Sequence, residues 1–145
     1  MVSRAIREQF LPRSIEGELP KSIAGQVLSL AVRLDTVAAF FHVGLVPTGS
    51  EDPFALRRNA TAIVRIILEE KLRLDIRSYV DTARDLVIGD GFKGGADSSR
   101  DGRSRIIEFI FDRVRPYARV ALAWRDEVIE AVLKQSQDIS LDLWA

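Results

Sequence analysis

The sequence contains no cysteine and only one histidine, His42. The lack of cysteine excludes disulfides and thiolate metal sites, and it fits a reducing compartment. One histidine can build neither a histidine-rich metal centre nor a cysteine–histidine nucleophile pair. We therefore expect His42 to be a packed or hydrogen-bonded core residue.

The chain also has no net charge at pH 7, because 21 basic residues balance 21 acidic residues. No global positive field points to a nucleic acid, and no DNA partner is expected. Any contact with RNA must come from arginines that cluster locally.

Signals for export or membrane insertion are absent too. The N-terminus, M-V-S-R-A-I-R-E-Q-F, lacks the apolar centre of a signal peptide, and no apolar run approaches membrane-spanning length. We expect a soluble, cytoplasmic protein with no membrane partner. Its 145 residues are enough for one compact core, so we expect a single helical domain over residues 1–145.

What the chain does contain is a series of apolar residues at helical spacing. The pattern predicts an all-α domain of about five to six helices and no strand. The expected helices cover residues 22–43, 54–71, 75–88, 103–122 and 124–135, with a further helix starting at 140. Residues 89–102 contain five glycines and little apolar content, so a mobile Gly-rich loop is expected there.

The segment 22–43 is apolar on two sides, and such a helix is expected to be buried and central. The first stripe consists of Val27, Leu30, Ala31, Leu34, Val37, Ala38 and Phe41, and the opposite side carries Leu28, Val32, Ala39 and Phe40.

The next helix is preceded by a polar turn over residues 46–52. Asp52 is a good N-cap for this helix, and Pro53 suits its first position, where a backbone N–H is not needed. Along the helix, Arg58 and Arg65 are expected to point away from the inner apolar face.

Two short stretches imitate phosphate-binding motifs. Residues 89–94 spell G-x-G-x-x-G, but they follow a helical pattern and do not close a strand, so a flexible loop is the better interpretation. Residues 47–50, P-T-G-S, lack the spacing and the lysine of a P-loop. We interpret them as a turn whose amides could still meet an RNA phosphate.

Residues 34–65 form the most specific stretch, L-D-T-V-A-A-F-F-H-V-G-L-V-P-T-G-S-E-D-P-F-A-L-R-R-N-A-T-A-I-V-R. It resembles a signature of the bacterial glycyl-tRNA synthetase β subunit, in which K-L-D-T-L and an apolar run precede G-x-x-P-T-G-S-x-D-P-F-A-L-R-R. Residues 10–21, 109–117 and 124–133 resemble further blocks of that family.

This resemblance implies an enzyme of α and β subunits that uses ATP and Mg to join glycine to its tRNA. The α subunit carries the aminoacylation site, and the β subunit contributes tRNA binding and assembly. The chain resembles an internal fragment of β, truncated at both ends. We therefore expect no catalytic residue and no cofactor in this chain, and partners that comprise the α subunit, the rest of β and tRNA.

The resemblance also places the chain in a helical region similar to the HD metal phosphohydrolases. Those enzymes end their metal motif with an Ala-Asp pair, whereas this chain has Ala31-Val32 at the matching positions. Valine supplies no oxygen to a metal, so no metal site is expected. Two alternatives stay open: a stand-alone helical scaffold or RNA-binding module, and a degenerate HD-type phosphohydrolase.

Arginines and aspartates of the signature are the candidate site residues. Arg57 and Arg58, and with them Arg65, are expected to form a surface for tRNA or a partner, because arginine forks suit phosphate. Asp52 is expected to be a structural anchor. Asp35 lies on the helix expected to be buried, so it should anchor the loop over residues 44–52.

Overall fold

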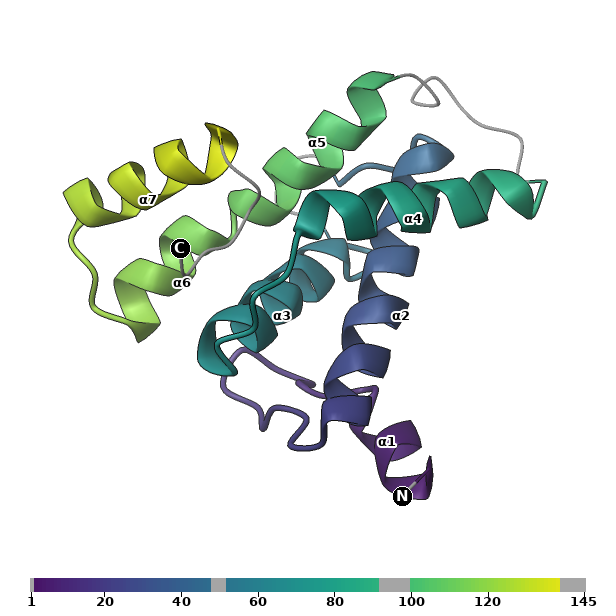
Figure 1. Ribbon diagram of the computed structural model, residues 1–145, viewed down its shortest axis with the longest axis horizontal. Coiled ribbons are helices and arrows are strands. Elements are labelled where there is room, and N and C mark those ends of the chain that lie inside the picture. Colours follow the sequence, from purple (N-terminus) through teal and green to yellow (C-terminus); the bar gives the residue numbers. More distant parts are fainter. Residues whose placement is uncertain (1, 48–51, 92–99, 139–145) are drawn as a thin grey trace.

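The computed structural model describes residues 2–47, 52–91 and 100–138 (Figure 1). Within these ranges the chain forms helices and no strand, so the expected all-α class is confirmed. The helices are α1 (Val2–Glu8), α2 (Ile23–His42), α3 (Leu56–Glu69), α4 (Ile76–Gly89), α5 (Arg100–Phe111), α6 (Val114–Ala121) and α7 (Asp126–Asp138).

α2 lies at the centre of the fold. It packs against α1, α3, α4 and α5, while α6 and α7 pair with each other and α6 contacts α3 (Figure 1). Each large apolar side chain buried in this way contributes about 1.5–3 kcal/mol. The shared core includes the fully buried side chains of Val37, Phe41, Leu56, Ile63, Ile66, Val80, Ile106, Ile110 and Val114.

Two helices differ from the sequence prediction. α1 was not predicted, because its described residues bury only Ala5 and Glu8 and show little apolar period. The helix predicted over residues 103–122 is divided into α5 and α6 at Asp112 and Arg113. In an unbroken helix, Pro116 would leave the carbonyl of Asp112 without its donor and clash with it. The break places Pro116 in the first turn of α6, where no donor is required.

The expected Gly-rich loop is shorter than predicted, since α4 extends to Gly89 and α5 begins at Arg100. Gly102 is buried within α5. Residues 92–99 of that loop, and the helix expected from residue 140, lie outside the described residues.

One side of α2 is exposed, so the prediction that both of its faces are buried is wrong for its first half. Ile23 is 80% exposed and Val27 is 59% exposed, and Val32 also faces outward. With 20 residues α2 is also long and apolar enough to cross a membrane, contrary to the sequence expectation. This is weak evidence for a membrane span, because a core helix of a folded protein meets the same criterion.

A buried carboxylate joins α1 to the start of α2. Glu8 Oε2 accepts hydrogen bonds from the backbone N–H of Ser22, at 3.0 Å, and from its hydroxyl group. The same hydroxyl oxygen caps α2 by accepting from the N–H of Gly25 at 3.1 Å. Hydrogen bonds from Ser22 and Arg4 lower the pKa of Glu8 to about 2 and outweigh the opposite effect of burial.

We predict that Gly25→Ala destabilises the fold by about 1–3 kcal/mol through overpacking. A Cβ at this residue would lie 2.2 Å from Glu8 Oε2 and 2.6 Å from Glu8 Cβ. In an open helix the same change would stabilise by about 1 kcal/mol. Gly89→Ala is the control, because a Cβ there meets nothing within 4 Å. Denaturant unfolding measures both variants, and a stabilised Gly25→Ala protein would contradict this close approach of α1 and α2.

Candidate functional site

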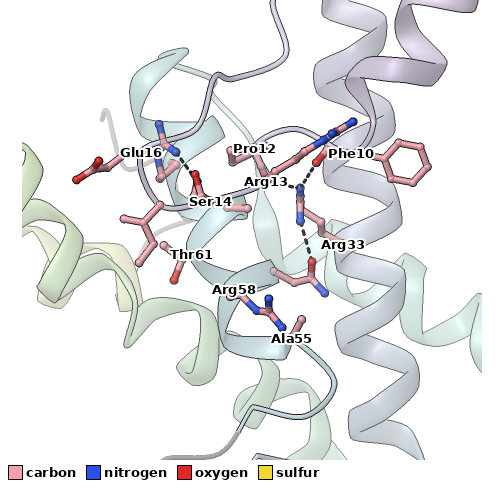
Figure 2. Close-up of a pocket in the computed structure, with 13 residues that line it drawn as sticks. Phe10, Pro12, Arg13, Ser14, Glu16, Arg33, Ala55, Arg58 and Thr61 are labelled. Carbon is pink, nitrogen blue, oxygen red and sulfur yellow. Dashed lines mark hydrogen bonds between the residues drawn. The ribbon is translucent and has the colours of Figure 1, made fainter.

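The N-terminal segment, residues 9–22, passes over α2 and α3 and leaves a cavity of about 740 Å³ between them (Figure 2). We call it the arginine cavity, because four arginines and one acidic residue stand in its wall. Its lining residues are Phe10, Pro12, Arg13, Ser14, Ile15, Glu16, Arg33, Ala55, Arg58, Asn59, Thr61, Ala62 and Arg65.

Arg33, from the middle of α2, holds the first part of this segment. Its Nη2 donates to the carbonyl oxygens of Phe10, at 3.3 Å, and Pro12, at 2.9 Å, and its Nη1 donates to Asn59 Oδ1 at 2.7 Å (Figure 2). Its Nε donates to the Ser29 hydroxyl at 3.2 Å. These acceptors are all neutral, and no carboxylate forms an ion pair with Arg33 among the described residues. Burial lowers the pKa of Arg33, but the guanidinium remains charged near neutral pH.

Arg65, from α3, holds the next part of the segment. Its Nη1 donates to the carbonyl oxygens of Ser14 and Gly17, at 3.1 Å each, and its Nε donates to Glu69 Oε1 at 2.7 Å. The residue is only 6% exposed, so the prediction that Arg65 points to a surface is wrong. Arg65 is buried because the N-terminal segment covers this side of α3. The apolar pattern of α3 alone predicts that this side faces water.

Glu69 links Arg65 to α6 through the phenol of Tyr117, which donates to Glu69 Oε1 at 2.5 Å. Burial alone would raise the pKa of Glu69, but the hydrogen bonds from Arg65 and Tyr117 lower it. For Arg65, burial acts to lower the pKa, and the contact with Glu69 raises it overall. Burial, followed by the bond to Glu69, raises the pKa of Tyr117 to about 12.

The carboxylate of Asp52 organises the start of α3. Its Oδ1 accepts from the N–H of Arg57 at 3.2 Å, and its Oδ2 accepts from the N–H of Arg58 at 3.3 Å. The prediction that Asp52 is the N-cap and Pro53 the first helical residue is wrong, because the N-cap is Ala55 and α3 begins at Leu56. Asp52 instead reaches the amides of the first turn from three residues before the cap. The first amides of a helix have no internal acceptor, and an anion stabilises this end.

The two arginines of this turn differ in position. Arg58 is the exposed one: its side chain is 70% exposed, lines the arginine cavity, and has Nε 3.9 Å from Asp52 Oδ2. An exposed contact of this kind is worth little energy and leaves the charge available. Arg57 is half-buried and does not line the cavity.

Asp35 and His42 occupy different environments on α2. Asp35 is exposed, so its predicted burial is wrong, and residues 48–51 of the loop it was expected to anchor lie outside the described residues. It projects from the same side of the helix as Val32, which no described helix covers. His42 is buried, as expected. In the described ranges no group of three or more histidine or acidic side chains could hold a metal ion.

Sequence reasoning missed Phe10, Arg33 and Asn59 as site residues. A signal for Arg33 existed, because a charged residue on a helix expected to be buried needs hydrogen-bond partners. The contact between Arg33 and Asn59 joins positions 26 residues apart, so no local pattern could reveal it.

Known proteins are similar to this sequence over most of its length. A family profile described as "Glycyl-tRNA synthetase beta subunit" matches residues 1–134. The "Glycine--tRNA ligase beta subunit" of Lactobacillus gasseri is 40% identical over 146 residues, which cover 99% of this chain and 21% of that protein. The proteins of the same description from Shouchella clausii and Oenococcus oeni are 37% and 41% identical, over 91% and 79% of this chain. The chain spans about a fifth of the length of these relatives.

We predict that Arg65→Met lowers the free energy of unfolding by about 2 kcal/mol, because hydrogen bonds to a charged group are lost and two backbone carbonyls lose their donor. Methionine keeps most of the apolar stem. The matched control is Arg58→Met, which should change stability by less than about 0.5 kcal/mol, since that side chain is exposed. Denaturant unfolding compares the two, and equal losses would contradict the structural role of Arg65.

The raised pKa of Tyr117 predicts a loss of stability in alkali. Folding favours the neutral phenol, so its contribution is fully present below the ordinary pKa of 10.0 and is lost as the pH rises through about 12. Over this window the free energy of unfolding should fall more steeply in the wild type than in Tyr117→Phe. Tyr79→Phe is the control, because Tyr79 is exposed and should leave the slope unchanged. Equal slopes in all three proteins would contradict the network.

Proposed function

The chain belongs to the glycyl-tRNA synthetase β-subunit family, and from this premise we propose that it serves as a helical segment of such a subunit. In this role it supports the ATP-dependent attachment of glycine to tRNA by binding tRNA and by contributing to assembly with an α subunit and the rest of β. No residue of this chain is assigned a catalytic or metal-binding role.

The proposed tRNA contact rests on the local positive charge of the arginine cavity. Four arginines and only one acidic residue, Glu16, line it. Arg65 is paired with Glu69, whereas Arg33 is bound to neutral acceptors and Arg58 has only a distant carboxylate. A local excess of guanidinium groups attracts phosphate even when the whole chain is neutral.

Arg58 is the residue best placed for a phosphate, and its position supports the sequence-based hypothesis for it. It is exposed at the wall of the cavity and follows directly after the turn that Asp52 organises. Arg65 is withdrawn from this surface, because its donors are used by the N-terminal segment. Arg57 remains a candidate of second rank, since it is half-buried and lies outside the cavity wall.

We predict that Arg58→Ala in the complete α/β enzyme weakens tRNA binding while folding stays intact. Each lost phosphate contact should reduce the slope of log K against log salt by about one unit. Filter binding at several salt concentrations measures the slope. Arg119→Ala is the matched control, because its side chain is also exposed and lies outside the cavity.

The isolated chain provides a second control and should form no glycyl-tRNA from ATP, glycine and tRNA. If Arg58→Ala leaves tRNA affinity, salt slope and subunit assembly unaltered, Arg58 is a solvated surface residue and the proposed tRNA contact is wrong. Glycyl-tRNA formed by the isolated chain would refute the absence of a catalytic site.

A further inference from the structure

The N-terminal segment leaves the helices and returns to them at nearly the same point. Glu8, at the end of α1, is bonded to Ser22, at the start of α2, through the Ser22 backbone N–H at 3.0 Å and through its hydroxyl group. The residues between them, 9–21, run out over α2 and α3 and come back (Figure 1). A surface loop whose two ends are held together in this way can move as one unit about those ends.

We propose that residues 9–21 act as a lid on the arginine cavity, which lifts about the contact between Glu8 and Ser22 while the helices stay folded. Lifting the lid exposes the cavity wall, including Ala62 and Arg65. The closed position is the stable one, and the motion is independent of the proposed tRNA contact.

Hydrogen bonds from side chains of α2 and α3 to backbone carbonyls hold the lid closed. Arg33 and Arg65 each donate to two carbonyls of the lid. The Ser29 hydroxyl and Gln26 Nε2 each donate to one more, at 2.6 Å and 3.2 Å. Among the described residues no backbone-to-backbone hydrogen bond joins the lid to either helix. When the lid lifts, water replaces the lost partners, so each of these bonds contributes only a small net free energy to closure.

Apolar packing adds little to the closed lid. Phe10 and Ile15 are 57% and 68% exposed, and the ring of Phe10 points away from the cavity (Figure 2). Of residues 9–21 only Pro12 and Pro20 are buried, and Pro20 lies beside the hinge. The space between the lid and the helices is a cavity of about 740 Å³ and not packed side chains. Few buried apolar contacts are typical of a unit that opens at a lower free energy than the core.

Thiol labelling tests the lid directly, because the chain has no cysteine and an introduced one reports only on its own position. Ala62→Cys places a thiol on the cavity wall, at a residue that is 4% exposed. Ala38→Cys is the matched control, because Ala38 is 1% exposed, belongs to the helical core and does not line the cavity. Val120→Cys gives the rate of an open thiol, since Val120 is 83% exposed on α6. Each full-length variant reacts with the thiol reagent DTNB at several urea concentrations below the unfolding transition.

The rates should fall in a definite order. We expect Ala62→Cys to react about a hundredfold faster than Ala38→Cys, because the lid opens more often than the core unfolds. It should still react at least about tenfold more slowly than Val120→Cys, because the closed lid protects it. The rate of Ala62→Cys should rise only slightly with urea, since lifting a lid exposes much less surface than global unfolding does.

Two further substitutions separate the lid from the core. Ser29→Ala removes one bond to the lid and should speed the labelling of Ala62→Cys about fivefold, the effect of one hydrogen bond. Ile110→Val, in the core of α5, should speed the labelling of Ala38→Cys about two- to tenfold and leave that of Ala62→Cys unchanged. If Ala38→Cys does not fold, Ala118→Cys replaces it, because Ala118 is 0% exposed on α6.

The lid is refuted if Ala62→Cys shares the rate and the urea slope of Ala38→Cys, because its thiol then reacts only when the core unfolds. A rate as fast as that of Val120→Cys also overturns the lid, because the cavity wall is then open without any motion. So does a Ser29→Ala change without effect on Ala62→Cys, or an Ile110→Val change that speeds both thiols equally. None of these rates depends on tRNA, so the proposed function stands or fails separately.

Discussion

Backbone carbonyls that leave water must find a hydrogen-bond donor, and in this protein two arginines satisfy those of the N-terminal segment. Arg33 from α2 binds the carbonyls of residues 10 and 12, and Arg65 from α3 binds those of residues 14 and 17. The carbonyl of Leu11, between residues 10 and 12, accepts a hydrogen bond from the Ser29 hydroxyl at 2.6 Å. A segment without regular structure is thereby fixed across two helices, and the walls of the arginine cavity depend on this arrangement.

The same contacts decide which charges remain for a ligand. Arg65 is withdrawn into a network with Glu69 and Tyr117, so its charge is balanced and its role is structural. Arg33 meets only neutral oxygens, and therefore its charge adds to that of Arg13 and Arg58 at the cavity. A chain with no net charge can in this way present a local excess of positive charge, because the acidic residues that balance it lie elsewhere along the chain.

The exposed side of α2 has a different significance. Ile23, Val27 and Val32 lie on the first half of this helix, and no described helix covers them. Exposed apolar surface of this kind commonly marks a place of contact with further protein.

The sequence by itself determined the helical class, the approximate positions of α2, α3, α4 and α7, and the family, because apolar period and turn residues are local signals. It also indicated that Asp52 serves the start of α3. Only the tertiary structure decided which of the polar residues face water. Arg65 is buried because the N-terminal segment covers it, and Asp35 is exposed because nothing described packs over its side of α2. The contacts responsible join residues tens of positions apart, and such distances carry no periodic signal.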